Sequence, residues 1–247
     1  MPAFLKHKEN YWKSTPRAMG PFKGLQGGGV AGLMVFELEQ MAAEQTFGLA
    51  VSASIEFLLP TQPGELRTMP KVIRRGRRVS VLSNEIVQGS ACTARATVCF
   101  IHPTDIASVK PPAAQKSQPG DLAPIPPKKA IHGAPWMMDN FVVRPSDTGV
   151  IWFNYLDEIV EGMTPMAGVL GPADWTHGIG RPSSPQLADP NINLNVILSR
   201  HPVGKFIGIL PKTVWMPTGI GMGEGTLSDE EGDFGKVMMS VALTTFG

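Results

Sequence analysis

The sequence has few cysteines, almost no net charge and no long apolar run. Cys92 and Cys99, the two cysteines among 247 residues, lie seven positions apart in "ACTARATVCF", so on a strand their side chains point to opposite faces. Neither a disulfide nor a thiolate metal site is expected from this pair. A net charge of +1 gives no overall attraction to nucleic acid or to an anionic membrane surface.

Recognisable targeting and catalytic motifs are scarce as well. "MPAFLKHKENYWK" has no apolar core of signal-peptide length, and no stretch approaches the roughly 20 apolar residues of a membrane span. Nothing resembles a zinc site, a nucleophile elbow or a Cys/His pair. We expect a cytoplasmic protein with no metal, no nucleic-acid partner and no membrane segment.

A proline-rich stretch divides the chain. "KPPAAQKSQPGDLAPIPPKK" has no helical or strand period, which is typical of a linker laid over a surface. We therefore predict an N-terminal unit over residues 1–104, a linker over 105–135 and a C-terminal unit over 136–247.

The two halves repeat one order of elements. In the first, "GLQGGG" leads into "VAGLMVFELEQMAAEQ", whose apolar residues recur every three or four positions and predict a helix, followed by strands. In the second, "TPMAGVLGPADWTHGIG" is the predicted helix, and the turns "PTQPGE" and "RHPVGK" place Gly64 and Gly204 at matching points. A helix followed by a meander of strands, repeated once, predicts an α+β fold with each helix wrapped by strands.

The segment "GPADWTHGIG" concentrates polar chemistry in an apolar region. Asp174 is a candidate catalytic carboxylate, although an Asp near the start of a helix is commonly a cap. His177 lies one helical turn beyond it, and either a structural or a catalytic imidazole fits that position.

Six segments together resemble the double hot-dog acyl-CoA thioesterases, in which two hot-dog units are fused in one chain. They are "GLQGGGVAGLM", "IEFLLPTQPGEL", "VIRRGRRVSVLSNEI", "ADWTHGIG", "INLNVILSRHPVGKFIGI" and "SDEEGDFGKVMMSV". The resemblance covers nearly the whole chain apart from the linker. It implies a curled antiparallel sheet around each central helix, with the two sheets joined into one.

The resemblance also assigns site residues. It implies that Asp174 directs a water at a thioester carbonyl and that Asn191 helps to hold this water, with Asn193 or Asn195 as alternatives if the alignment is shifted. The family has a Gln where this chain has Met239, and a Met supplies no hydrogen-bond donor. We therefore expect slow hydrolysis of ordinary acyl-CoAs, or a substrate whose own polar group replaces the missing amide. We also expect Met239 to form part of the pocket wall.

The start of the first helix departs from the family in a second way. Gln26 stands before Gly27 and Gly28 where the family often has His, and a Gln does not titrate near neutrality. The free backbone N–H groups of Gly27 and Gly28 are candidates to polarise the carbonyl. The alternative is that these glycines permit only a tight start to a packed helix.

Two further motifs contain residue types that are common in ligand-binding sites. In "RRGRR", Arg75 and Arg77 are candidates for the phosphates of coenzyme A, which is part of the expected substrate rather than a cofactor; the alternative is a charged strand end facing solvent. "TGIGMGEG" lacks the following helix of a dinucleotide fingerprint, so its alternating glycines favour either close backbone approach on one face of a strand or a bulge.

Two other function classes stay open beside hydrolysis. A hot-dog hydratase or dehydratase needs a carboxylate working with a His, and Asp174 with His177 is the nearby pair. A non-catalytic acyl-CoA or acyl-carrier binding protein, or a unit recruited to another reaction, fits the loss of the family Gln. We also expect association into a homo-oligomer, because Ile73 and Val81 lie at predicted outward positions of the sheet.

Overall fold

The computed structural model describes residues 1–22, 24–110, 113, 119–120, 123–126, 135–180 and 187–245. The first half contains β1 (Phe4–Lys8), β2 (Tyr11–Ser14), the short 3₁₀ helix η1 (Pro16–Ala18), α1 (Gly27–Glu44), β3 (Leu49–Phe57), β4 (Glu65–Thr68), β5 (Lys71–Arg74), β6 (Val79–Gln88) and β7 (Ala91–Ile101). The second half contains η2 (Met137–Asn140), β8 (Phe141–Pro145), β9 (Ile151–Tyr155), α2 (Pro165–Ala173), α3 (Thr176–Ile179), β10 (Leu187–Ala188), β11 (Asn193–Leu198), β12 (Phe206–Trp215), β13 (Ile220–Asp229), β14 (Gly232–Ala242) and β15 (Thr244–Thr245).

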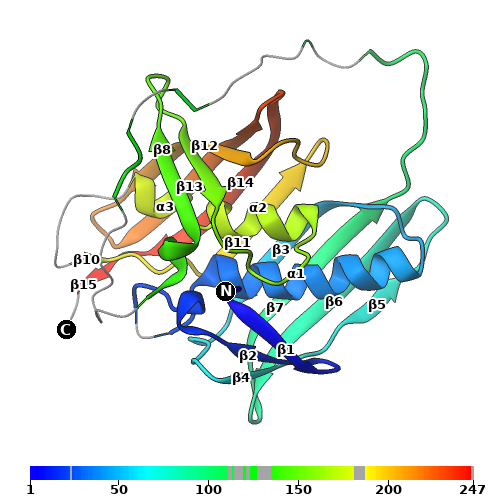
Figure 1. Cartoon of the computed structure of the whole chain (residues 1–247), viewed down its shortest axis with the longest axis horizontal. Helices are drawn as coiled ribbons and strands as arrows, with labels where there is room; N and C mark the ends of the chain where they lie inside the picture. Colours follow the sequence, from blue (N-terminus) through cyan, green and yellow to red (C-terminus); the bar gives the residue numbers. More distant parts are fainter. Residues whose placement is uncertain are drawn as a thin grey trace.

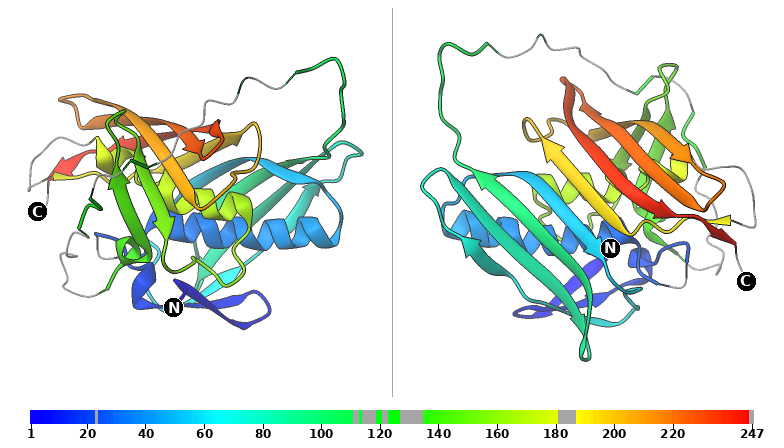
Figure 2. Two further views of the ribbon diagram at one scale, coloured as in Figure 1. Left: turned by 45° about the horizontal axis from the view of Figure 1, so that its top comes forward. Right: turned by 180° about the vertical axis from the view of Figure 1, so that it is seen from behind.

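One antiparallel sheet of 13 strands runs through both halves in the order β1-β2-β4-β6-β7-β3-β11-β14-β13-β12-β9-β8, with β5 paired to β6. The halves join where β3 pairs with β11, which places Ala53 opposite Val196. The sheet curls around α1 and α2 (Figure 1), and the view from behind shows its strands as one continuous layer (Figure 2). The predicted α+β double hot-dog architecture is therefore confirmed.

The matching turns of the two halves have a glycine in the same backbone conformation. Gly64 and Gly204 both have positive φ, at +129° and +84° respectively. Side chains disfavour this region, so glycine is the residue that permits each turn. After the second turn, the Asp229 carboxylate accepts from both Arg200 Nη groups and from the Val203 N–H, which fixes the loop to the end of β13.

Helix α1 is the central element of the core. Its residues Val30, Leu33, Met34 and Leu38 are at most 1% exposed, as the apolar spacing predicts. The helix is buried on nearly every side, including Val35, because strands pass behind it and α2 packs alongside it. A helix enclosed in this way derives its stability from packing rather than from helix propensity.

A buried carboxylate ties the two helices together at one end. Glu39 of α1 accepts hydrogen bonds from the Met166 and Ala167 N–H groups at distances of 3.2 and 3.0 Å and from the Thr164 hydroxyl. These are free donors of the first turn of α2, and an anion there is favoured by the helix dipole. Burial raises the pKa of Glu39, while the bonds from Thr164, Ala167 and Met166 act to lower it. Helices α1 and α2 therefore run antiparallel.

The prediction of one long helix over "TPMAGVLGPADWTHGIG" is wrong. The segment forms α2 and α3, separated by Asp174 and Trp175. Pro172 has no N–H to donate to the carbonyl of Gly168, which instead accepts a hydrogen bond from the Tyr155 hydroxyl at 2.9 Å. The Trp175 N–H then bonds to the Pro172 carbonyl, three residues earlier instead of the four of an α-helix, and α2 ends here.

Two glycines of α1 allow the helices to approach closely. A Cβ at Gly28 would lie 2.6 Å from the Leu170 carbonyl oxygen and 2.7 Å from the Asp174 Cβ. A Cβ at Gly32, one turn later, would lie 3.2 Å from the Ala167 carbonyl oxygen. Backbone atoms cannot move aside as the end of a flexible side chain can, so the close packing depends on glycine at position 28.

We expect Gly28→Ala to lower the free energy of unfolding by about 1–3 kcal/mol, because the new methyl group overpacks the contact with α2. Gly29→Ala is the matched control: a Cβ there meets atoms at 3.5 Å or more, and Ala favours a helix over Gly by about 1 kcal/mol. The control should be neutral or stabilising. Chemical denaturation measures both, and equal effects of the two substitutions would contradict the close-approach argument.

No helix of the described residues is long and apolar enough to cross a membrane.

Candidate active site

Asp174 lies at the C-terminal end of α2, where its backbone N–H bonds to the Leu170 carbonyl at 3.1 Å. Its side chain is 3% exposed. A carboxylate at this end is disfavoured by the dipole of its own helix, so Asp174 is not the helix cap that its sequence position allowed. The side chain instead faces the N-terminus of α1, where the dipole favours an anion.

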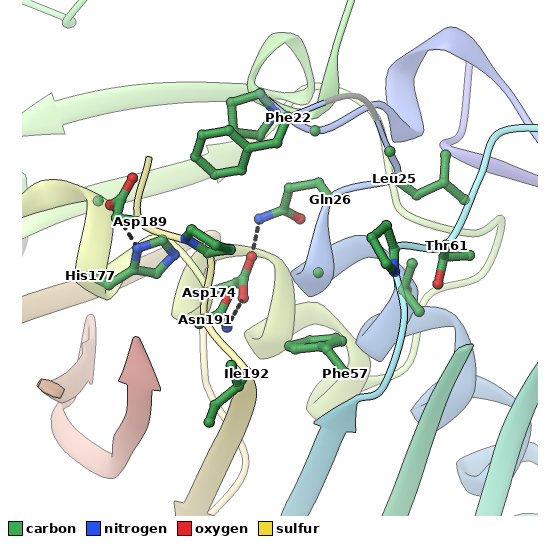
Figure 3. A pocket seen from close by; sticks show the side chains of 18 of the residues that line it. Phe22, Leu25, Gln26, Phe57, Thr61, Asp174, His177, Asp189, Asn191 and Ile192 are labelled. Carbon is green, nitrogen blue, oxygen red and sulfur yellow. Dashed lines mark hydrogen bonds and ion pairs between the residues drawn. The ribbon is translucent and has the colours of Figure 1, made fainter. Parts of the chain in front are cut away.

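Three donors hold the Asp174 carboxylate, and Figure 3 shows the two that are side-chain amides. The Asn191 amide donates to Oδ1 at 2.8 Å, the Gln26 amide donates to Oδ2, and the Gly28 backbone N–H donates a third bond. Asn191 also donates to the carbonyl of Asn193, so its amide group is oriented from two sides. The residue that reaches the carboxylate is thus Asn191, whereas the Asn193 side chain accepts from the Ser240 N–H.

Gln26 is fixed in the orientation that serves Asp174. It is the N-cap of α1, and its Oε1 accepts from the Gly29 N–H at 2.9 Å. Turning the amide over would place its NH₂ group against that N–H, so Nε2 is left to point at the carboxylate. One side chain therefore caps α1 and anchors Asp174.

Two opposing effects set the pKa of Asp174. Burial dominates and raises the pKa above its ordinary value, because the charged form loses its hydration. The charge of His177 and the hydrogen bonds from Asn191, Gly28 and Gln26 act in the opposite direction. The carboxyl group is thus a stronger proton acceptor than an exposed Asp and still has the donors that support its ionised form.

A second carboxylate stands beside His177. Asp189 Oδ2 lies 2.9 Å from His177 Nδ1, and the Asp189 side chain is 3% exposed. Sequence reasoning missed Asp189, which follows β10 in a stretch without helical or strand periodicity. Figure 3 shows the imidazole between Asp189 and Asp174.

The alternating glycines of β13 make room for α3. Gly221, Gly223 and Gly225 are buried on the inner face of the strand. A Cβ at Gly223 would lie 3.5 Å from the Cβ of His177, and one at Gly225 would lie 3.2 Å from the side chain of Thr176. The predicted close approach on one face of this strand is confirmed, and it is what allows His177 to lie near the cavity.

These groups line one cavity of about 460 Å³ between the two halves. Its walls are largely apolar and aromatic, and include Phe22, Phe57, Leu58, Trp175 and Ile192. The polar lining comprises Gln26, Thr61, Asp174, His177, Asp189 and Asn191. A volume of this size with a few convergent polar groups is typical of a small-molecule site.

Arg75 and Arg77, the candidates for binding the phosphates of coenzyme A, lie away from the cavity. Arg75 donates to the side chain of Gln45 and stacks over the Phe47 ring at 4.7 Å, both at the C-terminal end of α1. Gly27, at the other end of that 18-residue helix, lines the cavity. The two ends of the helix are about 27 Å apart. Arg77 is exposed in the same turn as Arg75. The structure does not bring either arginine to the cavity, because the β5–β6 hairpin lies at the wrong end of α1.

Met239 is 3% exposed on the inner face of β14, and its side chain is the nearest neighbour of Gly223. It is not among the residues that line the cavity. An amide does reach the carboxylate in this chain, but it comes from Gln26. Within the residues described, no group of three or more His, Cys, Asp or Glu side chains is arranged to hold a metal ion.

One family model matches part of the chain. Residues 15–101 match the family model described as the acyl-CoA thioesterase N-terminal domain. A search of curated protein sequences found no match.

Solved structures resemble the whole chain. A proposed thioesterase of Novosphingobium aromaticivorans aligns over 99% of each chain with 17% identity and a TM-score of 0.73. A hot-dog protein of unknown function from Alicyclobacillus acidocaldarius aligns over 99% of this chain and 97% of its own with 13% identity and a TM-score of 0.73. The acyl-CoA thioesterase II TesB2 of Mycobacterium marinum aligns over 99% and 95% with 13% identity and a TM-score of 0.67.

The resemblance found in the sequence motifs is therefore confirmed. The chain has the double hot-dog fold, and its first half matches the model of the acyl-CoA thioesterase N-terminal domain.

The raised pKa of Asp174 predicts a sign for the pH dependence of stability. A carboxyl group whose pKa is higher in the folded state stabilises the fold below its unfolded pKa of about 3.9, and this contribution is lost as pH rises through the folded pKa. The unfolding free energy of the wild type minus that of Asp174→Asn should therefore fall between pH 4 and pH 8. Denaturation at a series of pH values measures the difference, and a rise over this range would contradict the assignment.

Proposed function

We propose that the protein hydrolyses an acyl thioester, with Asp174 directing the attacking water. The observation that carries the proposal is the buried Asp174 carboxylate, held by two oriented amides and a helix N-terminus inside an apolar cavity. The match of residues 15–101 to an acyl-CoA thioesterase domain supports the same reaction class.

The hydrogen bonds of Asp174 favour a water-directing role. An ionised carboxylate offers about four acceptor positions, and Gln26, Asn191 and Gly28 occupy three of them. One position remains for a water molecule, and the raised pKa suits the carboxylate to accept a proton from it.

The start of α1 supplies the group that polarises the thioester carbonyl. Both Gly27 and Gly28 were candidates, but the Gly28 N–H already donates to Asp174. Gly27 lines the cavity at the first position of α1, and its N–H has no partner among the described residues. A backbone N–H fixed at a helix N-terminus stabilises negative charge on a carbonyl oxygen as it develops.

The cavity lining indicates which part of the substrate it holds. Apolar and aromatic side chains dominate, and no Lys or Arg occurs among the described lining residues. Leu58 and Ile192 are about half exposed, at 46% and 54%, and extend the apolar surface to the rim. The cavity therefore suits an apolar acyl group and the thioester, and the charged nucleotide of coenzyme A lies outside it.

Hydration of an enoyl thioester is the second candidate, because the cavity holds Asp174 and His177 together. Acyl-CoAs of short, medium and long chain, with a thiol-reactive dye, test hydrolysis, and the absorbance of an enoyl-CoA tests hydration. We expect thiol release. Enone loss without thiol release selects the hydratase, and binding of acyl-CoA with neither reaction selects a non-catalytic binding protein.

Asp174→Asn should lower the turnover of acyl-CoA by about 10²- to 10⁴-fold, the usual contribution of a general base. The Asn side chain also has an NH₂ group in place of one acceptor oxygen, so one of the donors that held the carboxylate would face another donor. We therefore expect the free energy of unfolding to fall by about 1–3 kcal/mol. Assays at a temperature where circular dichroism shows both proteins folded separate the two effects.

Two controls accompany this variant. Asp147→Asn changes a carboxylate in an exposed turn and should leave turnover unchanged. Asp174→Asn combined with Gln26→Glu restores donor–acceptor pairing, so it should recover stability without recovering activity. Wild-type turnover in the single variant would overturn the role of Asp174.

Ile73 is 56% exposed on β5, and further apolar side chains lie on the outer face of the sheet at Ile197 and Met238. We propose a homo-oligomer in the cytoplasm. Light scattering at micromolar concentration should give a mass above 26.5 kDa, and the mass of a single chain would refute the association.

A further inference from the structure

The cavity contains an acid–base pair that the proposed action of Asp174 does not use. His177 and Asp189 both line it, on the side of Asp174 that faces α3 and β10. Asp174, His177 and Asp189 are the titratable groups among the described lining residues. Of these three, only His177 can carry a positive charge.

Asp189 determines which ring nitrogen of His177 is free to react. The 2.9 Å contact joins Asp189 Oδ2 to Nδ1, and Asp189 is almost wholly buried. A carboxylate in this position keeps a proton on Nδ1 and orients the ring. Nε2 lies on the opposite side of the ring and has no hydrogen-bond partner among the described residues.

The strands packed against α3 add no charge near the imidazole. The side chains that face α3 from them are uncharged and include Thr213, Met239 and the glycines of β13. Lys212, Glu224 and Lys236 belong to the outward-facing positions of β12, β13 and β14. The described charged groups that face His177 are therefore Asp189 and Asp174.

The geometry points to His177 as a second catalytic residue, oriented by Asp189, which protonates the sulfur of the departing thiol. This inference rests on the proposed thioester hydrolysis. Asp189 is a positioning residue, because it acts on the reaction through the imidazole.

Each proton and electron pair in this scheme has a defined destination. Water forms a bond to the carbonyl carbon and gives one proton to Asp174. The carbon–sulfur bond then breaks, its electron pair stays on sulfur, and sulfur takes the proton from Nε2 of the imidazolium. Asp174 returns its proton to His177, and the carboxylic acid product releases its own proton to solvent.

The identity of the leaving group tests this role directly. The thiol of cysteine has a pKa of about 8.5, and a simple alkyl thiol such as that of coenzyme A is no more acidic, so its thiolate takes up a proton at neutral pH. A nitro-substituted aryl thiol is far more acidic and departs as the anion without a proton donor. Hexanoyl-CoA and the S-(4-nitrophenyl) ester of thiohexanoic acid carry the same acyl group and differ in this need.

The variant to use is His177→Asn, whose amide keeps a donor for Asp189 and removes Nε2. We expect turnover of hexanoyl-CoA to fall by about 10²-fold or more, the usual contribution of a general acid. Turnover of the nitrophenyl ester should stay within about threefold of the wild type, because its rate does not depend on the missing proton.

Further variants keep the result interpretable. Asp189→Asn should show the same selective loss on the CoA ester, to a smaller extent, because the ring remains but its orientation is no longer fixed. His7→Asn, on exposed β1, is the control for loss of a histidine and should behave as the wild type. Equal losses on both esters, or no loss on either, would overturn the role of His177.

Asp174→Asn in the same assays separates this inference from the proposed function. Loss on both esters in that variant, together with an unchanged His177→Asn, rejects the proton donor and retains thioester hydrolysis. A wild type that hydrolyses neither ester rejects both.

Discussion

The structure depends on one electrostatic contact between two helices. Asp174 ends α2, where the dipole of its own helix disfavours a negative charge, and it is accepted there because the N-terminus of α1 faces it. Gly28 permits this approach, since any Cβ at that position would meet the backbone of α2. At the other end of the same pair, Glu39 of α1 caps the first turn of α2. Each helix therefore satisfies the free donors of a helix end through a carboxylate of its partner.

This arrangement links stability to chemistry. A carboxylate withdrawn from water would ordinarily be protonated or paired with a cation, and burial does raise the pKa of Asp174. Gln26, Asn191 and Gly28 replace the lost hydration with fixed donors. Donors that are already in place need no reorganisation during a reaction. The contact that aligns the helices is thus the one that prepares the site.

Much of the fold was predictable from the sequence because it follows from local patterns. The apolar spacing of α1, the turns at Gly64 and Gly204 and the order of the elements each depend on residues close together in the chain. The break between α2 and α3 was also encoded, in Pro172, but a helical apolar pattern on both sides concealed it. Family motifs led to Asp174 and Asn191, which the structure brings together.

The remaining site residues could not be found in this way, because their roles depend on contacts between distant segments. Asp189 meets His177 only when β10 returns beside α3. The role of Gln26 requires both the cap of its own helix and the end of another helix 148 positions later. Conversely, Arg75 looked like a phosphate ligand because a charge cluster is visible in the sequence, while its distance from the cavity is not.

The central claim is that Asp174 activates a water molecule and does not itself attack the thioester. A single turnover of excess enzyme with an acyl-CoA in water labelled with oxygen-18 tests this directly by mass spectrometry of the product and of the peptide that contains Asp174. Our account predicts one labelled oxygen in the first acid released and an unlabelled Asp174. An unlabelled first product with label in the Asp174 carboxylate would contradict it, because that pattern requires an acyl-enzyme anhydride.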